Sequence, residues 1–131
     1  MKVRLWMTGS GAPKPPSVKV MTDEWISVGH GVDANGCLTE DFDVAGGSIR
    51  LHYEDIPESD ITTVDGIRVT TPLRTVIDLA AELDTTELDR MVQLSLDRDL
   101  FSVAEALVRL DQPDMAARPG ARVLRAHLQQ R

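Results

Sequence analysis

One junction near the middle of the chain limits the possible folds more than any other feature. Two β-branched runs, residues 61–64 and 67–70, are separated by Asp65-Gly66. An Asp-Gly pair between such runs favours a β-hairpin with a type I′ turn, because both central residues of that turn need positive φ. Thr71-Pro72 follow at once, and a threonine N-cap before a proline is typical of a helix start. The chain therefore changes from strand to helix at this point.

The residues after this junction carry helical patterns. Apolar residues from Leu73 to Ala80 fall at i, i+3, i+4 and i+7, which predicts an amphipathic helix that ends near Leu83. Two later positions combine an N-cap residue with a glutamate three residues on, the pattern of a capping box. A proline marks one more helix start. Four helices are expected, with starts at Thr71, Asp84, Ser102 and about Pro119.

The residues before the junction favour strands and turns. Short runs with alternating or β-branched apolar residues predict strands, and clusters of glycine and proline predict connections. The expected strands are residues 2–7, 18–21, 25–28 and 49–53, with an extended connector at 9–17 and a turn-rich stretch at 29–47.

The length of 131 residues suits one domain with a real core. The expected fold class is α+β, with N-terminal antiparallel β-strands and a hairpin followed by a C-terminal four-helix cluster. A single α+β domain over residues 1–131 is predicted, with a β-rich half at 1–70 and a helical half at 71–131.

Charge is distributed unevenly along the chain. The formal net charge is minus seven, and residues 1–117 contain ten Lys or Arg against all 21 Asp or Glu, a balance of minus eleven. The last helix could contact a partner or DNA, but its arginines could equally pair with carboxylates of their own chain. The net negative field opposes nucleic acid, so any DNA contact is expected to be weak. The arginines concerned are Arg118, Arg122, Arg125 and Arg131.

No catalytic residue is predicted. The glycines at residues 9–11 lack the spacing of a phosphate-binding loop, and no Gly-x-Ser-x-Gly elbow is present. Cys37 could act as a nucleophile with His30, but a lone cysteine in a turn-rich segment favours an incidental role. The three lysines also lack an acid two residues away, as metal-dependent nucleases often have. These observations predict a protein that is not an enzyme.

A metal site is weighed and not predicted, and no cofactor is expected. Acids and histidines between residues 30 and 55 offer suitable ligands, but their spacing matches no known pattern, and residues 33–36 resemble only the start of a calcium loop. Solvated acids in turns are the favoured interpretation. The residues concerned are His30, Asp33, Glu40, Asp41, Asp43, His52 and Asp55.

The sequence predicts a soluble protein in the cytoplasm. It has one cysteine, no stretch with the pattern of a secretory signal, and no apolar segment near the roughly 20 residues needed to cross a bilayer.

The segment Val64–Ala80, VDGIRVTTPLRTVIDLA, resembles a run in the AbiEi family of antitoxins and related actinobacterial regulators. The resemblance covers about residues 49–131.

The first two charged residues of the helix, Arg74 and Asp78, stand at i, i+4 and predict an exposed or partly buried ion pair. A structural role is expected for the motif residues Asp65, Gly66, Thr71, Pro72, Arg74 and Asp78.

The resemblance implies a hairpin that leads into a helical bundle, usually behind a winged helix that contacts promoter DNA. It also implies a partner, because such antitoxins counter a nucleotidyltransferase-like toxin. The first 48 residues differ from the family pattern. We therefore expect a non-catalytic, AbiEi-like regulatory module of a toxin-antitoxin or phage-defence system that works through protein contacts. The alternative is a protein-interaction or assembly subunit with no nucleic-acid role.

Overall fold

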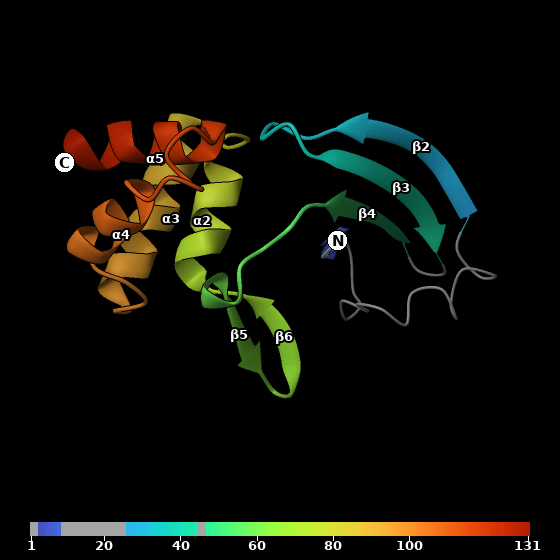
Figure 1. Ribbon diagram of the computed structural model, residues 1–131, viewed down its shortest axis with the longest axis horizontal. Coiled ribbons are helices and arrows are strands. Elements are labelled where there is room, and N and C mark those ends of the chain that lie inside the picture. Colours follow the sequence, from blue (N-terminus) through green and yellow to red (C-terminus); the bar gives the residue numbers. More distant parts are fainter. Residues whose placement is uncertain (1–2, 9–25, 45–46) are drawn as a thin grey trace. The chain divides into compact units, whose positions relative to one another are not determined.

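The computed structural model of the chain describes residues 3–8, 26–44 and 47–131. Antiparallel strands in two sheets come first and four helices follow (Figure 1). The predicted α+β class is therefore confirmed. The connector expected at 9–17 and the strand expected at 18–21 lie outside the described residues.

The larger sheet has four strands in the order β1-β4-β3-β2. Every neighbouring pair is antiparallel, and the pairing of β2 with β3 contains an irregularity between Ser27 and Gly29. Strand β2 lies at an edge of this sheet (Figure 1). The four strands are β1 (Val3–Thr8), β2 (Ile26–Val32), β3 (Leu38–Val44) and β4 (Gly47–Tyr53).

The prediction of a turn-rich stretch at residues 29–47 is wrong for most of these residues. Strand β2 continues to Val32, and β3 occupies much of the remainder. The connection between these two strands is a turn, and Gly36 takes a positive φ of 86° there. The sequence of β3, LTEDFDV, conceals a strand because three acids interrupt its apolar residues, and acids are depleted in strands.

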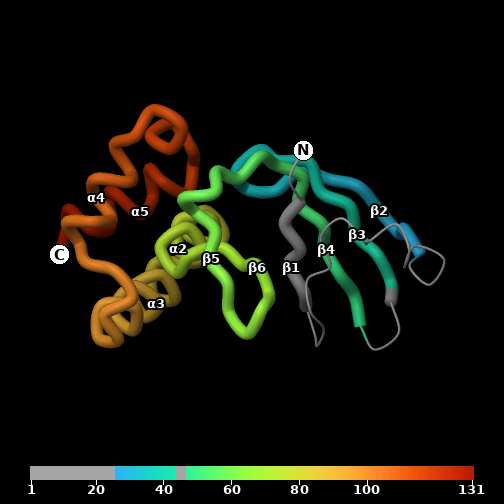
Figure 2. The backbone as a smooth tube through the Cα atoms, turned by 60° about the horizontal axis from the view of Figure 1, so that its bottom comes forward, coloured from blue at the N-terminus to red at the C-terminus, as the bar shows by residue number. Residues whose placement is uncertain are grey.

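The hairpin forms at its predicted position. Strands β5 (Ile61–Val64) and β6 (Ile67–Thr70) pair as a separate two-stranded sheet. The turn residues Asp65 and Gly66 have φ of 51° and 79°, as the type I′ turn requires. Figure 2 follows the chain from this hairpin directly into the first helix of the series.

The four predicted helices are present. Thr71 caps the first of them by accepting a hydrogen bond from the Arg74 N–H, and this helix ends three residues before the predicted Leu83. Asp84 and Glu87 form a complete capping box at the second, and Ser102 caps the third. The helices are α2 (Pro72–Ala80), α3 (Thr85–Asp97), α4 (Val103–Leu110) and α5 (Pro119–Gln129).

The chain forms two compact units. One contains the described residues up to Glu58 together with the hairpin tip, residues 63–68, and the other contains residues 59–62 and 69–131. The helical unit has an aliphatic core to which all four helices contribute, with Ile77, Val92, Ala106 and Leu124 fully buried. The expectation of one domain stays a prediction. Within the described residues, no helix has the length and apolar character of a membrane span.

Candidate functional site

The motif segment joins the hairpin to helix α2. The backbone N–H of Thr71 donates to the carbonyl of Asp60 (2.8 Å), which closes the base of the hairpin. The Thr75 hydroxyl lies 2.7 Å from that of Thr70 and also donates to the Thr71 carbonyl. The threonines of the motif thus fix the direction in which the chain leaves β6 and enters the helix.

Arg74 lies at the centre of this junction. Its side chain is 3% exposed, and it donates from Nε to Asp78 Oδ1 (2.9 Å) and from Nη1 to Asp60 Oδ2 (2.8 Å). The predicted pair with Asp78 therefore exists. It is fully buried, however, and not exposed or partly buried as its position on a helix indicated. The second carboxylate comes from Asp60, in a 3₁₀ turn (Glu58–Asp60) that precedes the hairpin.

Two further arginines extend the arrangement on both sides. Arg109 of α4 donates from Nε and Nη2 to the two carboxylate oxygens of Asp60 (3.0 and 2.7 Å). It also binds Asp114 through Nη1 and Nη2 (2.8 and 2.9 Å). Arg118, the N-cap residue of α5, donates from Nη2 to Asp78 Oδ1 (2.9 Å).

These contacts form a continuous chain of six side chains in which acids and bases alternate. It joins the hairpin base, α2, α4, the α4–α5 connection and the start of α5 within the helical unit. Three positive and three negative charges cancel, so the burial of ions is compensated within the group. We call this group the charge ladder. Its members, in order, are Asp114, Arg109, Asp60, Arg74, Asp78 and Arg118.

Two carboxylates of the ladder, Asp60 and Asp114, have pKa values below the ordinary one. Burial by itself would raise the pKa of Asp60, but the hydrogen bonds from Arg109 and Arg74 outweigh that effect and lower it below the ordinary 3.8. The hydrogen bonds from Arg109 likewise lower the pKa of Asp114. The two carboxylates in turn raise the pKa of Arg109 above its ordinary value. The lowered pKa values of Asp60 and Asp114 and the raised pKa of Arg109 all favour the charged forms that these ion pairs need.

The structure places the four C-terminal arginines differently from one another. Arg118 belongs to the ladder, and Arg125 contacts Asp111 and donates to the Leu110 carbonyl (2.6 Å). Arg131 contacts Asp89 (3.1 Å) and Gln93. Arg122 is exposed. Three of the four thus contact carboxylates of their own chain, as one of the two interpretations of the sequence had it.

The acids and histidines of the sheet form pairs. His52 Nδ1 lies 2.7 Å from Asp33 Oδ2, and both side chains are buried. The second Asp33 oxygen accepts from the N–H groups of Asn35 and Cys37 (2.8 and 2.9 Å). Burial opposes this charge, but the hydrogen bond from His52 and those backbone donors lower the pKa of Asp33 below 3.8. Asp33 therefore ties the β2–β3 turn to β4.

The two residues considered as a catalytic pair have other neighbours. His30 stands opposite Glu40 on β3, with 3.9 Å between Nε2 and Oε2. The Cys37 thiol donates to Glu54 Oε2 (3.4 Å). Within the described part of the chain, no three acids, histidines or cysteines are placed to hold a metal ion together.

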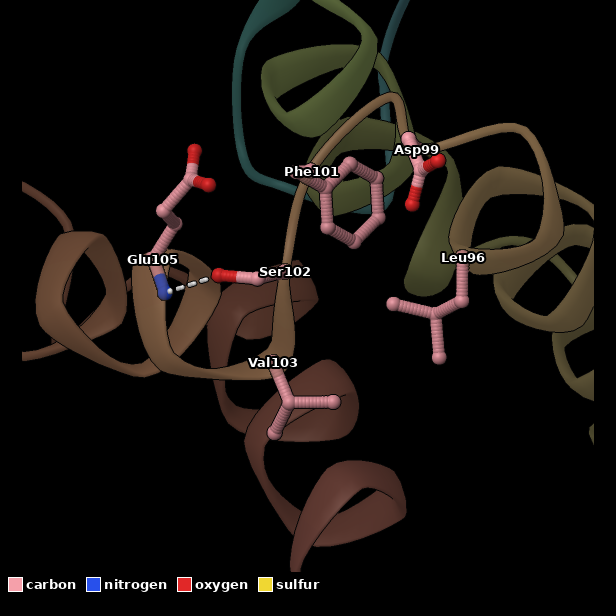
Figure 3. A pocket seen from close by; sticks show the side chains of 6 residues that line it. All are labelled: Leu96, Asp99, Phe101, Ser102, Val103 and Glu105. Atoms are coloured by element: carbon pink, nitrogen blue, oxygen red, sulfur yellow. Dashed lines mark hydrogen bonds between the residues drawn. The ribbon is translucent and has the colours of Figure 1, made fainter.

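One hollow lies where α3 gives way to α4 (Figure 3). It has a volume of about 350 Å³ and is lined by Leu96, Phe101 and Val103 with two acids at its margin. The Ser102 hydroxyl, drawn in the same view, accepts the Glu105 N–H (3.0 Å) and caps α4. The Ser102 hydroxyl is therefore already used to cap helix α4.

Comparisons of this chain with protein-family models, with curated proteins and with solved structures gave no match. The resemblance to the AbiEi family therefore stays a prediction that depends on the motif Val64–Ala80.

Sequence reasoning located only part of the ladder. Arg74 and Asp78 were found because helical spacing brings i and i+4 together. Asp60 and Arg109 were missed because they are 49 residues apart in the chain, and no local pattern specifies such a partner. For Arg118 the sequence left two alternatives open, contact with a partner or DNA and pairing with an acid of its own chain, and the structure places it against Asp78.

Proposed function

We propose that this chain is a non-catalytic regulatory module of the AbiEi antitoxin type, which acts in the cytoplasm through protein contacts in a toxin-antitoxin or phage-defence system. The observation that carries the proposal is the charge ladder. Two charged residues of the motif, Arg74 and Asp78, contact each other in it, and with Asp60 they hold the base of the hairpin against helix α2. Such an arrangement supports a binding scaffold better than a reaction centre, since the buried Arg74 and Asp78 are engaged in ion pairs within the helical unit.

The exposed apolar residues supply the second support. Among the described residues, four of them lie on strands β2 and β3 of the larger sheet. Two more flank the hairpin turn, one on each side. Scattered exposed apolar residues are ordinary, but β-branched residues on exposed strands are suited to contacts with another protein. The residues are Ile26, Val28, Val32, Leu38, Val64 and Ile67.

The partner implied by the resemblance is a nucleotidyltransferase-like toxin. If the neighbouring gene encodes such a protein, we expect the two chains to co-purify from a co-expression strain and the toxin to lose its effect on growth. Expression of the toxin with the Arg74→Met variant serves as a control, because loss of the brace should weaken both results. A folded native chain that neither binds nor neutralises the toxin would refute the antitoxin proposal.

An assembly or interaction subunit with no nucleic-acid role is the second candidate. It is favoured by the contacts of Arg118, Arg125 and Arg131 with acids of their own chain, since a paired arginine has less charge to offer to phosphate. Both candidates bind protein, and they differ in whether DNA is also bound.

A gel-shift titration against DNA from upstream of the gene separates them. Arg122→Glu and Arg125→Glu should abolish any shift seen at low salt if α5 contacts DNA. The matched control is Arg90→Glu, which makes the same charge change at an exposed position of α3. No shift with the native chain at low salt would remove the DNA component and favour the second candidate.

A further inference from the structure

Strand β2 is an edge strand with little protection. Among the described residues no strand pairs with its outer side, and six of its seven residues are exposed. Natural edge strands usually carry lysine, proline or an inward-pointing charge that prevents pairing with another chain. The sequence of β2, ISVGHGV, contains none of these, and the irregularity between Ser27 and Gly29 is the protective feature that this strand does have. Instead its apolar residues Ile26, Val28 and Val32 are more than half exposed.

From this edge we propose that β2 is a docking strand, which accepts an extended, positively charged segment of a partner protein as an additional strand of the sheet. The inference rests on the proposed protein-binding function and adds the kind of segment that is bound. Addition of a strand to an exposed edge uses main-chain hydrogen bonds for affinity and alternate side chains for specificity.

Charge identifies the occupant. Between Ile26 and Glu58 the chain has seven Asp or Glu and one Arg. Three of these acids, Glu40, Asp41 and Asp43, lie on β3 directly beside β2. A second copy of the sheet would bring the same negative charge to the interface, and like charges across an interface oppose association. A segment rich in lysine or arginine has the complementary charge.

The two glycines of β2 give such a segment access to the acids. Gly29 stands opposite Asp41 in the register, and Gly31 stands opposite Thr39. Side chains of residues paired in this way lie on the same face of the sheet, so β2 presents no side chain in front of Asp41. A Cβ placed on Gly29 would meet no atom within 4 Å. The long stem of a lysine or arginine on an added strand can therefore cross β2 toward this carboxylate, which Arg50 of β4 already contacts from the opposite strand (2.7 Å).

The opposite face of β2 supplies an apolar contact. Val32 and its partner Leu38 are 64% and 65% exposed, and they lie on one face at one end of the sheet. Apolar side chains that alternate with the basic ones on an added strand would cover this pair, because successive residues of a strand point to opposite faces. The expected segment therefore alternates basic and apolar residues.

A fluorescent peptide of alternating lysine and valine is the probe, and its binding to the whole chain is measured by anisotropy. Two control peptides are matched to it. One replaces lysine by glutamate, and the other keeps the sequence but carries N-methyl groups that remove backbone donors. We expect the native chain to bind the lysine peptide at least about tenfold more tightly than either control, a difference of one decade in Kd.

Variants of the chain test the position. Val28→Lys and Val32→Lys place a positive charge on the edge and should lower affinity for the lysine peptide by about tenfold or more. Val108→Lys on α4 is the control, since Val108 and Val32 are both 64% exposed and the charge change is the same. Asp43→Asn should weaken binding by about two- to fivefold, as expected for one exposed charge.

Several outcomes would overturn the inference. Equal binding of the N-methylated peptide would reduce the effect to nonspecific charge attraction, and equal losses in the Val32→Lys and Val108→Lys variants would place the contact elsewhere. A dimer in sedimentation that Val28→Lys dissociates would make a second copy the occupant. If the native chain binds its toxin and the edge variants bind it equally well, the inference fails while the proposed function stands. If the native chain binds no toxin, the proposed function fails whatever the peptide does.

Discussion

Replacement of Arg74 by methionine tests the charge ladder at its centre. Methionine preserves much of the apolar stem but removes the hydrogen bonds to Asp60 Oδ2 and Asp78 Oδ1. Each of these acids keeps one arginine, so the ladder divides into a group of three, Asp114, Arg109 and Asp60, and a pair, Asp78 and Arg118, with a net negative charge overall. A hydrogen bond to a charged group contributes about 1.5–3 kcal/mol, so the two together are worth roughly 3–6 kcal/mol. A second estimate comes from buried ion pairs in general, where removal of one partner lowers the free energy of unfolding by about 3–5 kcal/mol.

The two estimates agree on a loss of about 3–5 kcal/mol in the free energy of unfolding. The whole free energy of unfolding of a native protein is roughly 5–15 kcal/mol, so the variant should be close to unfolding at the growth temperature. For a chain of this length the corresponding fall in Tm is about 10–20 °C. Circular dichroism at a helix-sensitive wavelength is the assay, because the ladder joins three of the four helices.

Three comparisons make the test specific. Arg74→Lys keeps the charge but cannot reproduce two divergent hydrogen bonds from one planar group, so we expect an intermediate loss. Arg90→Met removes an exposed arginine of α3 and should change stability by less than about 0.5 kcal/mol. A loss below about 1 kcal/mol for Arg74→Met would refute the ladder as a stabilising brace.

The pH dependence gives an independent check. The pKa of Asp60 is lower in the folded chain than its ordinary 3.8. Its ionisation therefore stabilises the fold above that ordinary value, and this stabilisation is lost as pH falls through the lowered pKa. The Arg74→Met variant should lose less stability between pH 5 and acid pH than the native chain does. Equal acid sensitivity in both would show that Asp60 does not depend on Arg74.

Two further predictions concern the strands. Burial and the hydrogen bond from its hydroxyl to Glu40 (3.0 Å) raise the pKa of Tyr53, the only tyrosine, to about 12. The ultraviolet titration of tyrosine should therefore have its midpoint near that pH, and Glu40→Gln should move the midpoint toward 10. No difference between the two titrations would contradict the contact. Gly66→Ala puts a side chain at a φ of 79° and should cost about 1–2 kcal/mol, measured by denaturant unfolding, whereas Asp65→Asn, at a position that asparagine tolerates, should cost little.

The parts of the fold that were predicted correctly depend on local chemistry. The Asp65-Gly66 turn and the capping residues Thr71, Asp84 and Ser102 each act within four residues of their own position, so the sequence displays them directly. Strand β3 was missed for the opposite reason. Its acids find partners on neighbouring strands, such as Arg50 for Asp41 (2.7 Å), and those partners become known only when the register is known.

The difference between local and long-range partners also explains which contacts of the candidate site were predicted. Helical spacing brings Arg74 to Asp78, and this pair was predicted. His52 and Asp33 are 19 residues apart, and the sequence alone offered them as two members of a metal cluster. Their pairing in the structure depends on β4 lying beside β3, next to the β2–β3 turn. Long-range partners of this kind follow from topology, which no periodicity in the sequence determines.

The spacing of the ladder along the chain also affects how the protein is made. Asp60 emerges from the ribosome 49 residues ahead of Arg109, and Asp78 emerges 40 residues ahead of Arg118. Until those arginines appear, Arg74 is the one ladder base already synthesised that contacts both carboxylates in the folded chain. The complete ladder therefore needs the start of α5, since Arg118, the N-cap residue of that helix, is its last member to be synthesised.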